Sequence, residues 1–323
     1  MRLTICGNIT VDQLMGPLGS MPEWGTELVV QDCHERTGGA IANSAFALAA
    51  LGMKVRLLSA VGDDQRGEFM LRQLKGAGVD VSGVGVDPHR ATSLGICLIR
   101  SDGERGFVTF LGALEGLTED VLWQDAPALK DGICFLNGYW LTPGFSPPRT
   151  IEVLRHLRAQ GTRTVLDTGW DPAGWPEPNR QGILAMLRHI DVFLPNESEA
   201  QALTGETDPE KMARGLARHS EGLIVVKLGA RGALACQGGQ TTWVTTTPRQ
   251  FKDTTGAGDV FNAGFLYGYL QGWPVERAIR FGHATAALVL ETGRRGFPVA
   301  DVTAEMDAQV ESAPPAAGEH SFT

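Results

Sequence analysis

The sequence predicts an α/β protein with a doubly wound, mainly parallel sheet, helices on both faces of that sheet, and a small additional β-sheet. From residue 133 onward, short apolar strands alternate regularly with helices. These strands are continuous apolar runs, which is typical of parallel strands covered on both faces. Two β-rich stretches, at about 12–37 and 85–111, do not follow this alternation, and we expect them to form the small sheet.

In the first half of the chain, turn residues separate the predicted elements. An Asp-Gly turn at 102–103 between two β-rich runs predicts a hairpin. Glycines end the first helix and the strand that follows it. The expected elements are a strand at 2–6, a strand-like piece at Glu27–Val30, a helix at 40–51, a strand at 55–60, a helix at 67–76, and hairpin strands at 93–99 and 106–111.

The second half consists of strand–helix repeats and two closing helices. Strands are expected at 133–136, 163–167, 191–194 and 222–228, with a short hairpin of 232–236 and 241–246. Helices are expected at 149–160, 180–188, 197–204, 209–219, 257–271 and 275–291. We expect one domain over residues 1–310 and a disordered tail over 311–323, which is rich in Pro, Ala and Ser.

Composition and charge argue against several classes of partner. The chain has 323 residues and a formal net charge of −9, so its surface repels nucleic-acid phosphates and anionic membranes. It contains no run of about 18 apolar residues that could cross a membrane. The five cysteines are scattered, which predicts free thiols in a reducing cytoplasm. We therefore expect a cytoplasmic protein whose partners include neither nucleic acid nor a membrane.

The segment from Asp253 to Asp259 (DTTGAGD) opens a helix and carries the strongest chemical signal. The first N–H groups of a helix lack partners, and glycines let an anion approach them closely. The backbone of Gly256, Ala257, Gly258 and Asp259 is therefore the expected anion hole for a phosphate. A carboxylate at its end suits a base that takes a proton from a hydroxyl, which makes Asp259 the candidate general base. Taken alone, the segment also fits a glycine-rich helix start.

Together with Val260 to Gly264, this segment resembles at every position the C-terminal signature of the ribokinase-like (PfkB) carbohydrate kinases. A second family signature is matched near the N-terminus by Gly38, Gly39, Asn43, Ala45, Gly52 and Gly62. Ile41 departs from this pattern, and Ala40 stands where ribokinases carry Lys, which weakens the case for ribose itself. The resemblance covers residues 3–298 and implies a ribokinase-like fold whose small sheet is a lid.

The resemblance also implies an acceptor pocket. Asp12 follows the first strand, and its two carboxylate oxygens can accept hydrogen bonds from two sugar hydroxyls. The alternative is that Asp12 is an ordinary aspartate in the turn after the strand. Asn43 suits a further hydroxyl, with a helix cap as its alternative. The carboxylates of Asp63 and Asp64 are interpreted as caps of the helix at 67. The acceptor residues implied are Asp12, Gly38, Gly39, Asn43 and Asn137.

Three further segments resemble the nucleotide-binding motifs of the family. Glu199 lies in an N-x-x-E motif after a strand and is expected to hold Mg²⁺ through water. Lys227 is expected to face the phosphates, and His283 to lie near the adenine. The alternatives are an exposed helix start for Glu199, a solvated side chain for Lys227 and a purely structural role for His283. The nucleotide-binding residues implied are Asn196, Lys227, Gly229, Gly232 and His283.

The family's reaction is direct in-line transfer of the γ-phosphoryl group of ATP to a hydroxyl, and the resemblance implies it here, with Asp259 as the base and Mg²⁺ on the phosphate oxygens. Closure of the lid would exclude water and limit wasteful ATP hydrolysis. Many members also hold K⁺ beside the anion hole, at positions that Asp253 and Thr255 match. Members commonly dimerise through the lid, so a homodimer is expected.

The sequence leaves the acceptor open. A phosphorylated acceptor needs basic residues near Asp12, and the first 35 residues hold only Arg2, which favours a neutral sugar. A nucleoside kinase of the same family is the main alternative, and a catalytically silent sugar or nucleotide sensor is a remote one. A nicotinamide-dependent oxidoreductase and a P-loop NTPase are disfavoured because their glycine-rich motifs do not occur. The sequence does not show whether Trp140 or Trp170 faces the sugar.

Overall fold

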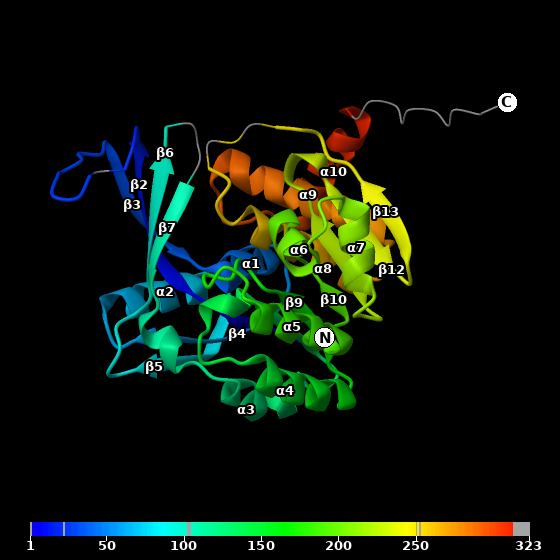
Figure 1. The fold of residues 1–323 in the computed structure, drawn as a ribbon. Helices are drawn as coiled ribbons and strands as arrows, with labels where there is room; N and C mark the ends of the chain where they lie inside the picture. Colours follow the sequence, from blue (N-terminus) through cyan, green and yellow to red (C-terminus); the bar gives the residue numbers. More distant parts are fainter. Residues whose placement is uncertain (1, 22, 102–104, 250, 252, 313–323) are drawn as a thin grey trace.

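Residues 2–21, 23–101, 105–249, 251 and 253–312 are described by the structure, which is a computed structural model. Within them, nine strands form a large sheet in the order β13-β12-β11-β10-β9-β8-β1-β4-β5 (Figure 1). From β11 to β5 the neighbours pair in parallel, whereas β12 and β13 are antiparallel additions. The strands span Leu3–Gly7 (β1), Val55–Gly62 (β4), Asp80–Asp87 (β5), Ile133–Asn137 (β8), Arg163–Asp167 (β9), Val192–Phe193 (β10), Leu223–Lys227 (β11), Ala233–Gln237 (β12) and Gln240–Val244 (β13).

The helices cover both faces of this sheet. They span Ala40–Ala50 (α1), Gln65–Gly76 (α2), Asp120–Leu129 (α3), Pro147–Ala159 (α4), Glu177–Met186 (α5), Glu197–Thr204 (α6), Pro209–Ala217 (α7), Ala257–Leu270 (α8), Val275–Thr292 (α9) and Val299–Ser312 (α10). Asp64 caps α2 as expected, because its carboxylate accepts the N–H of Gly67 at 2.8 Å. None of the helices in the described part of the chain has the length and apolar character needed to cross a membrane.

Alternating residues of the central strands belong to two apolar cores. In β1, Leu3 and Ile5 pack in a core with side chains of α1, α2, α8 and α9. Cys6, on the opposite face, packs in a second core with side chains of α3 to α7. Because successive strand residues point to opposite faces and both faces are covered, these strands read as continuous apolar runs.

Four strands form the separate small sheet, which lies to one side of the large one in Figure 1. Their order is β3-β2-β6-β7, and they span Thr10–Leu18 (β2), Asp32–Gly38 (β3), Leu94–Arg100 (β6) and Arg105–Phe110 (β7). β2 follows β1 after two residues, and β3 is followed at once by α1. These short connections place the base of the small sheet next to the carboxyl end of β1.

Most of the predicted elements are confirmed, but three expectations were wrong and two helices were missed. Glu27–Val30 is not a strand, since these residues have no partner strand among the described residues. β5 belongs to the large sheet, although residues 85–87 at its end were expected in the small sheet. The sequence did not reveal this because β5 is a half-exposed edge strand without a continuous apolar run. The helices α3 and α10 were not predicted. Residues 311 and 312 belong to α10, and the rest of the expected tail, 313–323, lies outside the described residues.

Candidate active site

The polar residues singled out from the sequence gather at the carboxyl edge of the large sheet. β8, β9 and β11 end at Asn137, Asp167 and Lys227. Asn196 follows β10 and forms an isolated bridge with Lys227. The helix α8 starts at the same edge, so Asp259 lies close to Asn137. Ligands of open α/β sheets bind at this edge, because the strand ends and helix N-termini meet there.

The start of α8 leaves backbone donors free for an anion. Gly256 caps the helix in the left-handed conformation, with φ at 79°, which glycine adopts without strain. A Cβ on Gly256 would lie 2.8 Å from Nδ2 of Asn43, so a larger residue does not fit. The N–H of Ala257 donates to a carbonyl of the preceding turn at 3.1 Å. Among the described residues no acceptor contacts the N–H groups of Gly258 and Asp259, and these two are available to a ligand.

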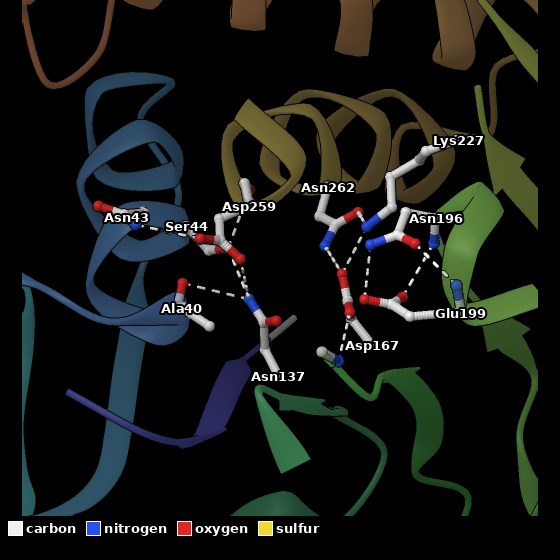
Figure 2. Close-up of polar contacts among 11 residues, drawn as sticks. Ala40, Asn43, Ser44, Asn137, Asp167, Asn196, Glu199, Lys227, Asp259 and Asn262 are labelled. Atoms are coloured by element: carbon white, nitrogen blue, oxygen red, sulfur yellow. Dashed lines mark hydrogen bonds and ion pairs between the residues drawn. The ribbon is translucent and has the colours of Figure 1, made fainter. Parts of the chain in front are cut away.

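Four side chains form the base cluster, which consists of Asn43, Ser44, Asn137 and Asp259 (Figure 2). Nδ2 of Asn43 donates to one oxygen of the Asp259 carboxylate at 3.0 Å, and Nδ2 of Asn137 donates to the other at 3.3 Å. Ser44 donates to the Asp259 carbonyl at 2.9 Å and accepts from Asn137 at 3.0 Å. α1, β8 and α8 therefore hold the carboxylate of the candidate base from two sides.

These contacts bear on two residues that the sequence singled out. The alternative of a helix cap was wrong for Asn43, because the cap of α1 is Gly39. Asn137, which was expected to bind the acceptor, is buried with 1% of its surface exposed and contacts Asp259.

The environment of Asp259 gives it the protonation behaviour of a general base. Burial raises the pKa of Asp259 to about 7, and the negative charge of Asp167 acts in the same direction. The hydrogen bonds from Asn43 and Asn137 and the charge of Lys227 partly oppose this shift. A base is most effective when its pKa lies near the operating pH, so this carboxylate can accept and release a proton near neutrality.

A second group of side chains, the ion-pair cluster, consists of Asp167, Lys227 and Asn262 and lies beside the base cluster (Figure 2). Nζ of Lys227 is 2.5 Å from Oδ2 of Asp167 and 3.2 Å from Oδ1 of Asn262. Nδ2 of Asn262 donates to Asp167 at 2.6 Å. Burial opposes the charge of Lys227, but the carboxylates of Asp167 and Glu199 outweigh it and raise the pKa of this lysine. Lys227 is thus paired and only 12% exposed, so the alternative of a solvated lysine was wrong.

Lys227 also connects this cluster with the start of α8. A Cβ placed on Gly258 would lie 3.4 Å from Nζ of Lys227. The ammonium group therefore lies next to the free N–H groups of Gly258 and Asp259. A cation and helix N-terminal N–H groups together form a site suited to a phosphate.

Glu199 and Asn196 form a capping box at the start of α6. Asn196 accepts the N–H of Glu199 at 2.9 Å, and Glu199 accepts the N–H of Asn196 at 2.9 Å. Glu199 is 3% exposed, and burial, followed by the negative charge of Asp167, raises the pKa of its carboxyl. The alternative of an exposed helix start was therefore wrong for Glu199. Two buried carboxylates near each other are the kind of oxygen donors that a hard cation prefers.

A cavity of about 430 Å³ lies beside α8 and the ion-pair cluster. Its walls include all the residues that the sequence assigned to the nucleotide, namely Asn196, Lys227, Gly229, Gly232 and His283. His283 is half-buried, and its ring lies 4.9 Å from that of Phe261. Burial lowers the pKa of this histidine to about 4. Its Nε2 atom has no hydrogen-bond partner within the described residues. Buried polar atoms normally have a hydrogen-bond partner, so this nitrogen is an exception.

The acceptor residues from the N-terminal signature lie where the small sheet meets α1. Asp12 is 5% exposed and accepts a hydrogen bond from Thr10 at 2.6 Å. A Cβ on Gly38 would lie 1.9 Å from a carboxylate oxygen of Asp12, so only glycine fits beside it. Gly39, with φ at 85°, caps α1. Burial raises the pKa of Asp12, although the charges of Arg36 and Arg295 oppose the shift.

The argument for a neutral acceptor depended on a scarcity of basic residues before residue 35. In the structure, Arg36 lies opposite Asp12 in the pairing of β2 with β3. Arg295, from the loop after α9, contacts the carbonyl of Thr37 and lies 3.4 Å from Oδ1 of Asn43. The chain separation between Arg295 and Asp12 hid this approach from the sequence.

Of the two residues suggested for a potassium site, Asp253 has other partners here, whereas Oγ1 of Thr255 is buried without a hydrogen-bond partner in the described part of the chain. The Asp253 carboxylate accepts the N–H of Thr255 at 2.8 Å. It also lies 3.4 Å from Nη1 of Arg36 and 3.9 Å from Nη1 of Arg105. Burial opposes the charge of Asp253, but these hydrogen bonds and arginines lower the pKa of its carboxyl. Two guanidinium groups therefore already neutralise this carboxylate.

Several residues of these clusters were missed at the level of sequence. Asp167 was only the last residue of an expected strand, and Ser44, Asn262 and Arg295 were not singled out. Asp167 at a strand end and Asn262 three residues after Asp259 were the available signals, because a strand end and a shared helix face bring such residues to the site. Trp140 and Trp170 pack edge-on to Trp175, each with ring centroids 6.0 Å apart, and Trp170 is 54% exposed.

The doubly wound sheet, the free helix N-terminus with its lysine, and the adjoining carboxylate of near-neutral pKa together define a class of protein, the phosphotransferases with a hydroxyl acceptor. Comparison with known proteins agrees. The model of the pfkB family of carbohydrate kinases matches residues 7–300. The chain is 30% identical over 293 residues to a ribokinase of Haemophilus influenzae, covering 88% of this chain and 91% of that protein.

Further relatives differ in the acceptor that their names give. A 5-dehydro-2-deoxygluconokinase of Geobacillus kaustophilus is 30% identical over 264 residues, 79% of each chain. The adenosine kinase structure from Sinorhizobium meliloti has a TM-score of 0.80 at 26% identity and covers 95% of this chain and 98% of its own. The Arabidopsis thaliana ribokinase complexed with ribose and ATP has a TM-score of 0.78 at 23% identity and covers 94% and 98%. The protein belongs to the pfkB family of carbohydrate kinases, and its fold is the ribokinase fold.

Proposed function

We propose that the protein transfers the γ-phosphoryl group of ATP to a hydroxyl of a small carbohydrate, with Asp259 as the general base. The observation that carries this proposal is the position of Asp259, whose carboxylate lies at the free N-terminus of α8 and has a pKa of about 7. The base takes the proton of the acceptor hydroxyl while the oxygen of that hydroxyl forms a bond to the γ-phosphorus. The bond between the γ-phosphorus and the bridging oxygen of ADP breaks at the same time. The proton therefore ends on Asp259 and the phosphoryl group on the acceptor.

The neighbouring residues then have separate tasks. The N–H groups of Gly258 and Asp259, with the ammonium group of Lys227, stabilise negative charge on the transferred group. The cavity of about 430 Å³ takes the nucleotide, and His283 in its wall faces the base or sugar of that nucleotide. Asp12 and Asn43 bind acceptor hydroxyls. The small sheet closes over the acceptor as a lid.

Mg²⁺ fits this proposal through its preference for oxygen ligands and water. The described residues contain no group of three or more His, Cys, Asp or Glu side chains arranged to hold a metal ion. Mg²⁺ commonly keeps most of its waters and is held by one or two carboxylates together with phosphates. Glu199 and Asn196 are the residues that would hold those waters, and the ion, when bound, would neutralise charge on the phosphate oxygens.

A nucleoside acceptor is the second candidate, and the similarity to an adenosine kinase structure at 26% identity favours it. The two candidate functions differ only in the acceptor molecule that binds beside Asp12. Activation by K⁺ through Asp253 and Thr255, and dimerisation through the small sheet, stay predictions. Phe107, Val108 and Phe110 on that sheet are exposed, and light scattering in solution tests the dimer.

The experiment is a measurement of ADP release and phosphorylated product with Mg-ATP across ketohexoses, aldopentoses, sugar acids and nucleosides. The Asp259→Asn enzyme is measured in parallel, and each assay is run with K⁺ and again with Li⁺. Turnover of one acceptor that the variant loses supports the proposal. Binding of ATP without turnover of any acceptor would instead favour a sensor that only binds sugar or nucleotide. Equal rates in K⁺ and Li⁺ would contradict the prediction that K⁺ activates the enzyme.

A further inference from the structure

Two arginines from distant parts of the chain meet beside the proposed acceptor site. Arg36 is on β3, directly opposite Asp12, and Arg295 is in the loop that follows α9. Burial, followed by the positive charge of Arg36, lowers the pKa of Arg295 to about 10. Arg295 is therefore charged at neutral pH, and the two guanidinium groups lie close enough to repel each other.

The positive charge of this pair is only partly compensated by the protein. Arg295 contacts the Thr37 carbonyl and Oδ1 of Asn43, and its guanidinium lies 4.5 Å from the ring centre of Phe46. It forms no ion pair with a carboxylate of the described residues. Arg36 shares Asp253 with Arg105, and its Nε is buried without a hydrogen-bond partner in the described part of the chain. Charges and donors that are withdrawn from water are normally paired, and an anion from outside would supply the partner that these half-buried arginines lack.

The position of the pair connects it with the reacting atoms. Asn43 contacts Arg295 through its oxygen and Asp259 through its nitrogen, so a single side chain separates the arginine from the candidate base. A cavity of about 80 Å³ has Arg36, Arg295, Asn43 and Asp253 in its walls. Asn43 thus lines this cavity with its side chain and contacts the candidate base with its Nδ2 atom.

We propose that the acceptor is a sugar acid, and that Arg36 and Arg295 bind its carboxylate. This inference rests on the kinase function proposed above and specifies its substrate class. The local charges favour a carboxylate over a phosphate, because three guanidinium groups, those of Arg36, Arg105 and Arg295, face the two carboxylates of Asp12 and Asp253. These groups leave one positive charge in excess, which equals the charge of one carboxylate. A planar guanidinium can also donate two parallel hydrogen bonds to the two oxygens of a carboxylate.

The test compares acids with neutral molecules of the same shape. Pentonates, hexonates and their keto-deoxy derivatives are each paired with their carboxamides, and kcat/KM with Mg-ATP is measured for the wild type and for Arg295→Met. We expect the wild type to favour one acid over its amide by about 10- to 100-fold, the value of a charge-assisted hydrogen-bond pair. Arg295→Met should abolish that preference, and Arg295→Lys should restore part of it. Arg72→Met, an exposed arginine on α2 paired only with Glu68, is the matched control.

The ratio of acid to amide separates recognition from structure. If Arg295 only supports Asn43 and the loop around it, Arg295→Met lowers both rates equally and the proposal is overturned. A wild-type preference for amides, neutral sugars or phosphorylated sugars overturns it as well. Arg36→Met provides the same comparison if Arg295→Met does not fold.

Calorimetric binding of the acids without ATP distinguishes this inference from the kinase function. If an acid binds in an Arg295-dependent manner but no acceptor is phosphorylated, the kinase function fails and the carboxylate site stands. If a neutral sugar is phosphorylated and no acid binds or reacts, the carboxylate site fails and the kinase function stands.

Discussion

The base cluster and the ion-pair cluster lie side by side at the edge of the same sheet, yet they hold their carboxylates in opposite ways (Figure 2). Asp259 receives hydrogen bonds from two neutral amides, those of Asn43 and Asn137. Asp167 receives one neutral amide, that of Asn262, and the charged ammonium group of Lys227. Both clusters combine a strand end with a residue from the first turns of α8, and the base cluster adds Asn43 and Ser44 from α1.

The partner determines what each carboxylate can do. Neutral donors stabilise the ionised form only moderately, so burial keeps the pKa of Asp259 near 7, where a proton can be gained and lost. A charged partner places a fixed opposite charge beside the carboxylate, and loss of either charge would leave the other uncompensated. The base cluster is therefore suited to proton transfer, and the ion-pair cluster to fixed electrostatic support.

The largest effect is expected from removal of the base. Asp259→Asn should lower kcat by about 10²- to 10⁴-fold while ATP still binds, because only the proton acceptor is lost. Asp167→Asn removes the same charge from the neighbouring cluster and is the matched control. We expect it to retain more turnover than Asp259→Asn. Steady-state kinetics and nucleotide titration of both variants check this, and a variant of Asp259 with wild-type turnover would contradict its role.

The next effect is on stability and belongs to the ion-pair cluster. Lys227→Met should lower the free energy of unfolding by about 3–5 kcal/mol, because it leaves the buried Asp167 carboxylate without its partner. The double variant with Asp167→Asn should recover much of that loss. Urea unfolding of the two single variants and the double variant measures the coupling. Independent, additive effects would show that the two side chains do not form a pair in solution.

The smallest effect is a shift in the pH profile. Since Asp259 must be deprotonated to act, kcat/KM should rise as the pH increases through about 7. The hydrogen bond from Asn137 lowers the pKa of Asp259, so Asn137→Ala should move this acidic limb upward, by about half a unit to one unit for a hydrogen bond of about 1 kcal/mol. Asn43→Ala should shift it in the same direction. If the acidic limb stays at the same pH in both variants, the titration of Asp259 does not cause it.

The sequence identified one member of each cluster more readily than the others. Asp259 and the glycines before it form a local motif with a chemical reason for every position, and Lys227 ends an obvious strand. Asn137 was assigned to the acceptor, because a sequence shows that a residue follows a strand but not whether it is buried. Asp167 and Asn262 were not assigned at all, since their role depends on Lys227, which lies 60 residues from one and 35 from the other.

The sequence by itself determined the class of fold, the family, the candidate base and several residues in the wall of the cavity of about 430 Å³. Each of these depends on local order, such as apolar runs, helix starts and short spacings, that a chain carries in its linear pattern. The partners of the buried charges were decided only by the tertiary structure. Arg295 approaches Asp12, and Lys227 approaches Asp167, across chain separations that no spacing encodes. The pKa of Asp259 and the charge of the acceptor site depend on these approaches, because electrostatic interactions are set by distance and burial in the folded protein.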